Sequence, residues 1–160
     1  MSGKSPKIIV KELSGARAAI ISARWHSEIC DLLVDGAKRA IIESKISDIS
    51  VHEVPGSFEL PLAAKFALEN GADFAVVVGV VVKGETPHFD YVCKGVTDGI
   101  MKVSLDLGKP IGFGVLTVEN IEQAIARSGG PGSKEDKGYD SAIAALELLR
   151  LHRHLDGRFA

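Results

Sequence analysis

A run of nine apolar residues, Phe74–Val82, limits the possible folds of this chain more than any other feature of its sequence. Because neither face of this segment is polar, it is typical of a buried strand in a parallel sheet. A helical pattern follows at residues 91–107, where Val92, Val96, Ile100 and Val103 recur at helical spacing. The segment therefore indicates a sheet whose central strand is covered on both sides.

Strands and helices alternate along the whole chain. Short segments with strand patterns predict strands at residues 17–23, 48–54, 74–82 and 111–116. Helical periodicity and stop signals such as Asn70-Gly71 predict helices at residues 26–44, 59–70, 91–107, 119–127 and 138–154. This order predicts an α/β fold, a three-layer αβα sandwich in which right-handed crossovers place helices on both faces of a four-stranded parallel, flavodoxin-like sheet.

The 160 residues contain no linker or repeat, so residues 1–160 are expected to form a single domain. In this interpretation residues 1–14 are an N-terminal arm and residues 15–160 are the α/β core. Residues 7–13 of the arm have strand propensity, but Ser14-Gly15 separates them from the first core strand. Such a strand could lie at the edge of its own sheet or pair with a neighbouring subunit, and the residues alone do not choose between the two.

Composition argues against several classes of partner. The formal net charge is −2, from 19 Lys and Arg against 21 Asp and Glu, which does not indicate binding to nucleic acid or to a membrane surface. The first residues lack an apolar signal region and no run approaches transmembrane length, so a cytoplasmic protein is expected. Cys30 and Cys93 lack the spacing of a metal site and are expected to be reduced core thiols.

The loop after the valine-rich strand is the first candidate for a functional site. Gly84, Thr86 and His88 lie between the carboxyl end of that strand and the amino end of the next helix. Ligands of open α/β sheets bind at this edge, and free N–H groups at a helix start attract anions. His88 is able to transfer a proton near neutral pH. The alternative is a loop with a helix-capping Thr86 and a solvated His88.

Residues suited to ligand binding also follow the first and second strands. Trp25 offers a planar stacking surface, although it could equally cap the core. Gly56 lets the backbone approach a ligand closely, whereas Glu59 suits a helix start for electrostatic reasons alone. His26 and His52 are expected to be an ordinary helix-start residue and an ordinary strand-surface residue.

The C-terminal part of the chain contributes cations. Arg127 closes a predicted helix, where the helix dipole by itself favours a positive charge, and Lys137 lies within chain reach of it. Together with the helix start at His88, these two cations could hold a phosphate. His152 and His154 point to different sides of one helix, so they form a poor metal site and are expected to be solvated.

Four segments resemble the 6,7-dimethyl-8-ribityllumazine synthase family, in the order that the family has them. They are VPGSFELP at residues 54–61, GETPHFDYVC at 84–93, GVLTVENIEQA at 114–124 with Arg127, and DKG at 136–138. The resemblance extends from about residue 15 to residue 150. It implies the penultimate step of riboflavin biosynthesis, in which 5-amino-6-(D-ribitylamino)uracil condenses with 3,4-dihydroxy-2-butanone 4-phosphate to give 6,7-dimethyl-8-ribityllumazine, phosphate and water.

The resemblance assigns one group of residues to the pyrimidine substrate. This group comprises Trp25, Ser57, Phe58, Glu59, Val80, Val81, Val82 and Phe113. Trp25 would stack on the pyrimidine ring, Glu59 would bind the ribityl hydroxyls, and the backbone of the three valines would bind the uracil edge. Phe113 would be a second aromatic residue at the pocket.

A second group is assigned to phosphate and to catalysis. Glu85, Thr86 and Arg127 match the phosphate-binding residues, Lys137 matches a nearby cation, and His88 matches the proton-transfer residue. The reaction needs neither a metal nor a redox cofactor, because each step is a proton transfer or the departure of a stabilised anion.

The resemblance also implies an assembly. Its members form a ring of five subunits with active sites at subunit boundaries, and the strand at residues 7–13 would be exchanged onto the sheet of a neighbouring subunit. The stretch between Arg127 and Lys137 looks longer than the tight turn of members whose pentamers build a shell, and Pro131 restricts it, so a free pentamer is expected.

Three positions depart from the common family pattern. Ser57 stands where many members have Ala, Lys83 where Arg is common, and Trp25 where many have Phe. The larger ring of Trp25 raises the possibility of riboflavin binding. Two alternatives remain: a flavin- or lumazine-binding shell protein without activity, and a flavodoxin-like nucleotide-binding module. The presence of His88 and Arg127 argues against the first, and the lack of a glycine-rich phosphate-binding motif argues against the second.

Overall fold

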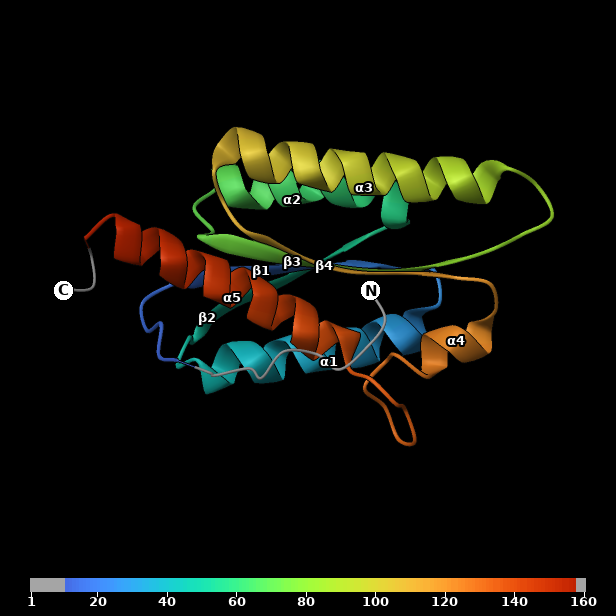
Figure 1. Ribbon diagram of the computed structural model, residues 1–160, viewed down its shortest axis with the longest axis horizontal. Coiled ribbons are helices and arrows are strands. Elements are labelled where there is room, and N and C mark those ends of the chain that lie inside the picture. Colours follow the sequence, from blue (N-terminus) through green and yellow to red (C-terminus); the bar gives the residue numbers. More distant parts are fainter. Residues whose placement is uncertain (1–10, 158–160) are drawn as a thin grey trace.

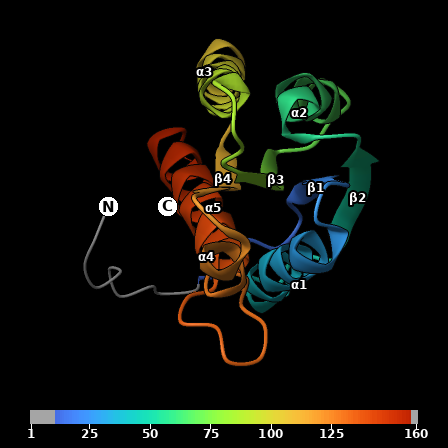
Figure 2. The ribbon, with the colours of Figure 1, turned by 90° about the vertical axis from the view of Figure 1, so that its right-hand side faces the viewer.

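The computed structural model describes residues 11–157, which form three layers (Figures 1 and 2). The middle layer is a parallel sheet in the order β2-β1-β3-β4, made of β1 (Arg17–Ala23), β2 (Asp48–Val54), β3 (Phe74–Val82) and β4 (Ile111–Val118). Helices α2 (Leu60–Glu69) and α3 (His88–Leu107) cover one face of the sheet. Helices α1 (Ser27–Glu43), α4 (Ile121–Ile125) and α5 (Lys137–Leu155) lie on the other. The predicted three-layer α/β fold is confirmed.

Strand β3 is the centre of the molecule because it pairs with β1 on one side and with β4 on the other. Its residues from Phe74 to Val80 are buried. Val76 and Val78 belong to the core beneath α1 and α5, whereas Ala75 and Val77 belong to the core beneath α2 and α3. The apolar run thus has both faces covered, as its composition predicts.

Helix α3 begins at His88, earlier than the predicted start at Tyr91. Pro87 occupies the N-cap position with φ −62°, and the N–H groups of Asp90 and Tyr91 donate to its carbonyl at 3.0 and 3.4 Å. A proline ring fixes φ near this value and so favours the first helical turn. His88 is consequently the first residue of the helix, at the end of the sheet where β3 terminates (Figure 1).

The observed ends of β4 and α4 also differ slightly from the predicted ones. Strand β4 continues beyond the predicted end at Leu116, since Thr117 and Val118 pair with the last two residues of β3. Helix α4 is shorter than predicted and begins after Asn120, whose side chain accepts a hydrogen bond from the Gln123 N–H at 3.0 Å. A single 3₁₀ turn, η1 (Ser57–Glu59), precedes α2.

Residues 7–10 of the predicted leading strand lie outside the described residues. Lys11, Glu12 and Leu13 form no strand. Leu13 is buried, and its N–H donates to the Ser44 carbonyl at 2.8 Å, which fixes this part of the chain beside the end of α1. Exchange of the arm with a neighbouring subunit therefore stays a prediction.

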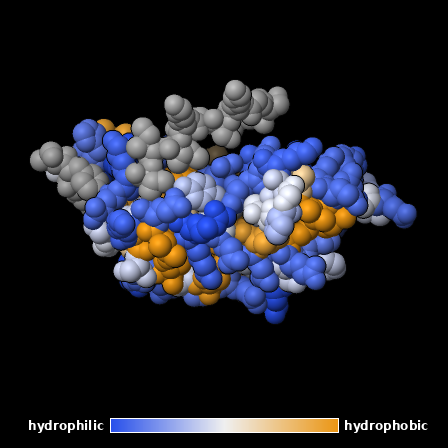
Figure 3. Space-filling view, turned by 90° about the horizontal axis from the view of Figure 1, so that it is seen from below, coloured by the Kyte–Doolittle hydropathy of each residue, from blue (hydrophilic) through white to orange (hydrophobic). Residues whose placement is uncertain are grey.

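Large apolar side chains are exposed on both helical layers. On α3, Met101 and Leu105 are 58% and 72% exposed. Figure 3 shows apolar patches between charged side chains on the opposite face. The exposed apolar side chains of α1, α4 and α5 are Ile42, Ile125, Leu148, Leu151 and Leu155. Within residues 11–157, no helix is both long enough and apolar enough to cross a membrane.

Candidate active site

A cleft of about 570 Å³ lies where β1, β2 and β3 end and α3 begins. It brings together many of the residues that the sequence predicts at the site: Trp25, Ser57, Phe58, Glu59, Val80, Val81, Val82 and His88. It also includes Gly56, which the sequence predicts to let the backbone approach a ligand, and three residues that the sequence analysis did not assign to the site: His26, Tyr91 and Val92. The predicted pyrimidine-binding segments, which are far apart in the sequence, thus face one volume.

Trp25 is presented to this cleft by the turn between β1 and α1. Its carbonyl accepts a hydrogen bond from the Cys30 thiol at 3.3 Å, and its side chain remains 69% exposed. Burial raises the pKa of Cys30 to about 11, so the thiol stays protonated and able to donate at neutral pH. The exposed ring excludes the alternative in which Trp25 caps the core.

His26 has a left-handed backbone conformation, with φ 56° and ψ 49°, and it occupies the N-cap position of α1. This conformation is uncommon for residues other than glycine, although histidine is among those that adopt it more often. The expected helix-start role is confirmed, but the residue also lines the cleft beside Trp25. The position of His26 directly after Trp25 is the sequence feature from which its place at the cleft could have been predicted.

The turn after β2 is closed by Glu59. One carboxylate oxygen of Glu59 accepts a hydrogen bond from the Gly56 N–H at 2.8 Å. A Cβ on Gly56 would lie 3.3 Å from that carboxylate and 3.4 Å from the Trp25 ring, so a side chain there would crowd both groups. Glu59 therefore has the structural role expected at a helix start and lies at the cleft as well.

Ser57 lies beneath the same turn and is only 6% exposed. Its hydroxyl is buried and has no hydrogen-bond partner among residues 11–157. It fits there because Gly79 of β3 has no side chain: a Cβ on Gly79 would lie 2.5 Å from the hydroxyl oxygen.

The start of α3 supplies the candidate acid–base group. His88 is exposed, and its N–H donates to the Thr86 hydroxyl at 3.4 Å. Thr86 thus satisfies one N–H at the start of the helix, although Pro87 is the N-cap residue, and His88 lines the cleft. Tyr91 follows one helical turn later on the same side of α3, which explains why it also lines the cleft. Glu85 and Thr86 are not among the described lining residues.

Arg127 and Lys137 lie close together but away from this cleft. The Lys137 N–H donates to the Arg127 carbonyl at 3.0 Å, and the Arg127 guanidinium donates to the Gln123 carbonyl at 2.9 Å. The Lys137 ammonium lies 2.9 Å from the Glu135 carboxylate and 3.3 Å from that of Asp140. The hydrogen bond to Glu135 is the main cause of the raised pKa of Lys137.

These two cations belong to the layer of α4 and α5, on the opposite side of the sheet from α3 (Figure 2). Phe113 is also separate from the cleft: it lies in the middle of β4 opposite Val77 and is 41% exposed at the edge of the sheet. Within one chain, then, the predicted site residues fall into two groups.

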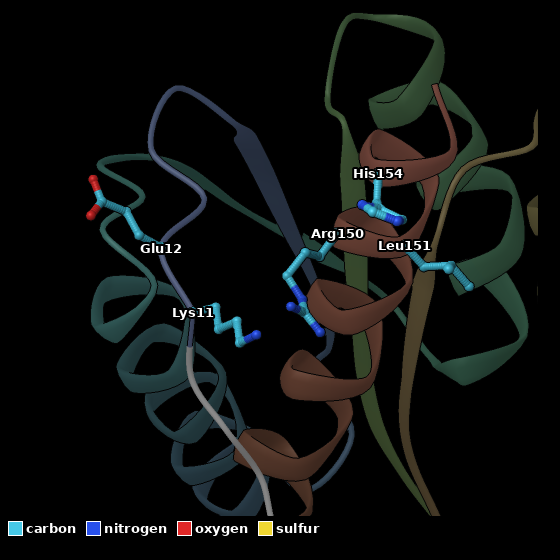
Figure 4. Close-up of a pocket in the computed structure, with 5 residues that line it drawn as sticks. All are labelled: Lys11, Glu12, Arg150, Leu151 and His154. Atoms are coloured by element: carbon cyan, nitrogen blue, oxygen red, sulfur yellow. The ribbon is translucent and has the colours of Figure 1, made fainter. Parts of the chain in front are cut away.

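A second cavity of about 440 Å³ lies between the first described residues and α5 (Figure 4). The side chains of Lys11 and Arg150 extend into the gap, whereas Glu12 points away from it. None of the predicted site residues is among the described residues that line it.

The remaining titratable candidates have ordinary surroundings. Both cysteines are free, but only Cys30 is a core thiol; Cys93 of α3 is half-buried. His52 is exposed on β2, and the Nε2 atom of His152 lies 3.3 Å from the Asp156 carboxylate. Residues 11–157 contain no group of three or more His, Cys, Asp or Glu side chains arranged to hold a metal ion.

Comparisons with known proteins agree with the motifs. The model of the 6,7-dimethyl-8-ribityllumazine synthase family matches residues 15–153. A protein of that name from Streptomyces coelicolor is 50% identical over 147 residues, which cover 91% of either chain. Those from Kineococcus radiotolerans and a Nocardioides strain are 49% and 43% identical, with at least 92% of each chain covered. The match extends over nearly the whole chain, including every segment that lines the cleft, and the chain therefore belongs to the 6,7-dimethyl-8-ribityllumazine synthase family.

Proposed function

We propose that this chain condenses 5-amino-6-(D-ribitylamino)uracil with 3,4-dihydroxy-2-butanone 4-phosphate to form 6,7-dimethyl-8-ribityllumazine, releasing phosphate and water. Family membership supports the reaction. The observation that carries the proposal for the site is the single cleft in which a stacking tryptophan, three strand-end valines and the first residue of α3, His88, face one another.

The pyrimidine would lie in this cleft against Trp25. A bound heteroaromatic ring buries the exposed indole face, and such stacking contributes roughly 0.5–1.5 kcal/mol beyond the area buried. Val80, Val81 and Val82 lie where β3 passes out of the core, so the backbone there lies beside the ligand. Gly56 leaves the ring room, because a side chain at that position would crowd Trp25.

His88 would move protons during the reaction. The uracil amine attacks the ketone of the second substrate and a first water leaves to form an imine; phosphate then departs, and the ribitylamino nitrogen closes the ring onto the remaining carbonyl carbon, from which a second water leaves. Each of these steps moves a proton, and a positioned acid–base group contributes typically 10²–10⁴-fold to rate. Holding the two substrates together would supply most of the remaining acceleration.

The phosphate of the four-carbon substrate would be bound by Glu85, Thr86, Arg127 and Lys137. The first two precede α3, whereas the cations lie in the opposite layer of the same chain. A complete phosphate site therefore requires the cations of an adjacent copy. This supports the expected ring of five subunits, in which Phe113, at the edge of the sheet, would also be supplied by a neighbour.

The decisive experiment is an assay of the purified protein with both substrates. Formation of 6,7-dimethyl-8-ribityllumazine, followed by its absorbance, together with one equivalent of phosphate, would support the proposal. Binding of lumazine or riboflavin without any turnover would instead indicate a binding protein. Because Trp25 is the only tryptophan, quenching of its fluorescence by riboflavin reports binding at the cleft directly.

A further inference from the structure

The carboxylate of Asp136 joins three parts of the fold at one point. Asp136 is the N-cap of α5, and its carboxylate accepts a hydrogen bond from the Tyr139 N–H at 2.9 Å. The same carboxylate forms an ion pair with Arg39 of α1. Two glycines leave room for it: a Cβ on Gly36 of α1 would overlap one of its oxygens, and a Cβ on Gly129 would lie 2.6 Å from the other. The carboxylate is thus enclosed between α1, the start of α5 and the loop that precedes α5.

The base of that loop connects Asp136 directly to the two cations of the candidate phosphate site. An antiparallel bridge pairs Ser128 with Asp136. Next to this bridge, the Lys137 N–H donates to the Arg127 carbonyl at 3.0 Å. Because the backbones of the two cationic residues are joined here, any displacement of Asp136 would displace both of them.

Arg39 is held in place by more than its ion pair. Its guanidinium lies 5.6 Å from the centre of the Tyr139 ring, and the Tyr139 hydroxyl donates to the carboxylate of Glu43, one helical turn after Arg39. The Arg39 side chain is nevertheless 52% exposed, and exposed ion pairs contribute little to the stability of a fold. This network therefore suits a positional role better than a stabilising one.

We propose that Arg39 is a positioning residue for the phosphate site: through Asp136 it holds Arg127 and Lys137 in the geometry that binds the phosphate of the four-carbon substrate. Arg39 itself does not touch the substrate. A guanidinium that grips phosphate through two parallel hydrogen bonds depends on its exact placement, so a small shift of the loop base weakens binding. This inference rests on the proposed function, which supplies the phosphate ligand.

The test begins with Arg39→Ala. We expect its KM for the butanone phosphate, and its Kd for inorganic phosphate measured by calorimetry, to rise roughly 3- to 10-fold. The KM for the pyrimidine should not change, and the Tm should change by less than about 2 °C. Arg39→Lys keeps the positive charge and should restore most of the lost affinity. A merely structural role would not separate the two KM values.

Two further variants identify the interaction. Asp136→Asn removes the charge that faces Arg39 but keeps an oxygen able to cap α5. It should raise the same KM, and the double variant should be no worse than Arg39→Ala, because both changes remove one interaction. Arg17→Ala is the matched control: it removes another exposed ion pair, with Asp48 at 3.0 Å, at the start of β1 and therefore away from the cleft. Both KM values should stay as they are in this control.

Several results would overturn the inference. An unchanged KM for the butanone phosphate in Arg39→Ala would mean that Arg39 does not act on the phosphate site. An equal rise in both KM values, or a fall in Tm well beyond that of Arg17→Ala, would mean a general structural role. Additive effects of Arg39→Ala and Asp136→Asn would mean that the two residues act separately. If the wild-type protein forms no lumazine, the proposed function fails and this inference fails with it; an active wild type with an unaffected variant overturns the inference alone.

Discussion

Trp25 owes its position at the cleft to its backbone, since little packs against its side chain. The Cys30 thiol donates a hydrogen bond to the Trp25 carbonyl, and the left-handed conformation of His26 directs the chain into α1. For residues other than glycine this conformation costs roughly 1–2 kcal/mol. Strain of this kind is found most often where a functional group must be presented. The indole ring is thus left exposed at the cleft.

Replacing His88 by alanine should lower the turnover number by one to two orders of magnitude. The effect lies at the low end of the range for acid–base groups because water can replace the imidazole. Stability should hardly change, since His88 is exposed. His52→Ala, on the exposed surface of β2, is the control and should have full turnover. Wild-type turnover in the His88 variant would remove this residue from the mechanism.

Cys30 makes the stability of the protein depend on pH in the alkaline range. Its pKa is raised by burial to about 11, from 9.0 in the unfolded chain. Below pH 9 the Cys30 thiol keeps its proton in both the folded and the unfolded state, so its contribution to the free energy of unfolding is fully present. Between pH 9 and 11 the thiol of the unfolded state loses its proton first, so this contribution is lost. A shift of this size corresponds to roughly 3 kcal/mol.

The measurement compares the Tm of the wild type and of Cys30→Ala from pH 7 to 11. The advantage of the wild type should be constant up to about pH 9 and should then shrink. Other groups that titrate in this range are common to both proteins and cancel in the difference. A constant difference across the whole range would contradict the raised pKa.

At the scale of elements, the sequence predicted correctly those strand and helix bounds that a local residue pattern determines. Strands β1, β2 and β3 have the predicted bounds because local strand patterns with clear turn signals define them. The early start of α3 depended on Pro87, whose fixed φ serves a helix start as well as a loop. The end of β4 depended on its pairing with β3, which is not a local property.

The candidate site can be divided in the same way, into features that follow from local sequence and features that depend on the packing of the whole fold. Residues at the ends of β1, β2 and β3 were predicted to meet because the carboxyl ends of parallel strands share one edge, and they line one cleft. Edge position alone does not reveal on which side of the sheet a following helix packs. For this reason the sequence did not separate Arg127 and Lys137 from the start of α3. The sequence analysis did not assign Tyr91 to the cleft, because its place there depends on α3 beginning at His88.

The contact between α1 and α5 depends on the absence of a side chain at Gly138. A Cβ there would overlap the Leu33 carbonyl of α1. Gly138→Ala should therefore push the two helices apart and destabilise the protein by about 3 kcal/mol or more. Thermal unfolding measures the effect. Gly84→Ala is the control for stability, because a Cβ on Gly84 would meet no atom within 4 Å; similar Tm values for the two variants would contradict the close packing.

At the scale of the whole molecule, we expect a free pentamer with a mass of about five times 17.0 kDa. The loop between α4 and α5 projects from the layer of α1 and α5 (Figures 1 and 2). It is held in place by an ion pair between Asp136 and Arg39 of α1 and by an antiparallel bridge from Ser128 to Asp136. A fixed projection there should obstruct contacts between pentamers.

Light scattering after size exclusion measures the particle directly. A mass in the megadalton range would contradict the obstruction by the loop and leave the pentamer intact as its building block. A monomer would contradict the shared active site as well.

The division of site residues between two layers also predicts a genetic behaviour. If His88 of one copy works with Arg127 of the next, His88→Ala and Arg127→Ala inactivate different halves of the same site. Each variant alone should have little activity, whereas refolding or co-expressing them in equal amounts should restore about a quarter of the sites, those with two intact halves. This would be intragenic complementation, and a strain that lacks its own enzyme should grow better without added riboflavin when it carries both defective alleles than when it carries either one.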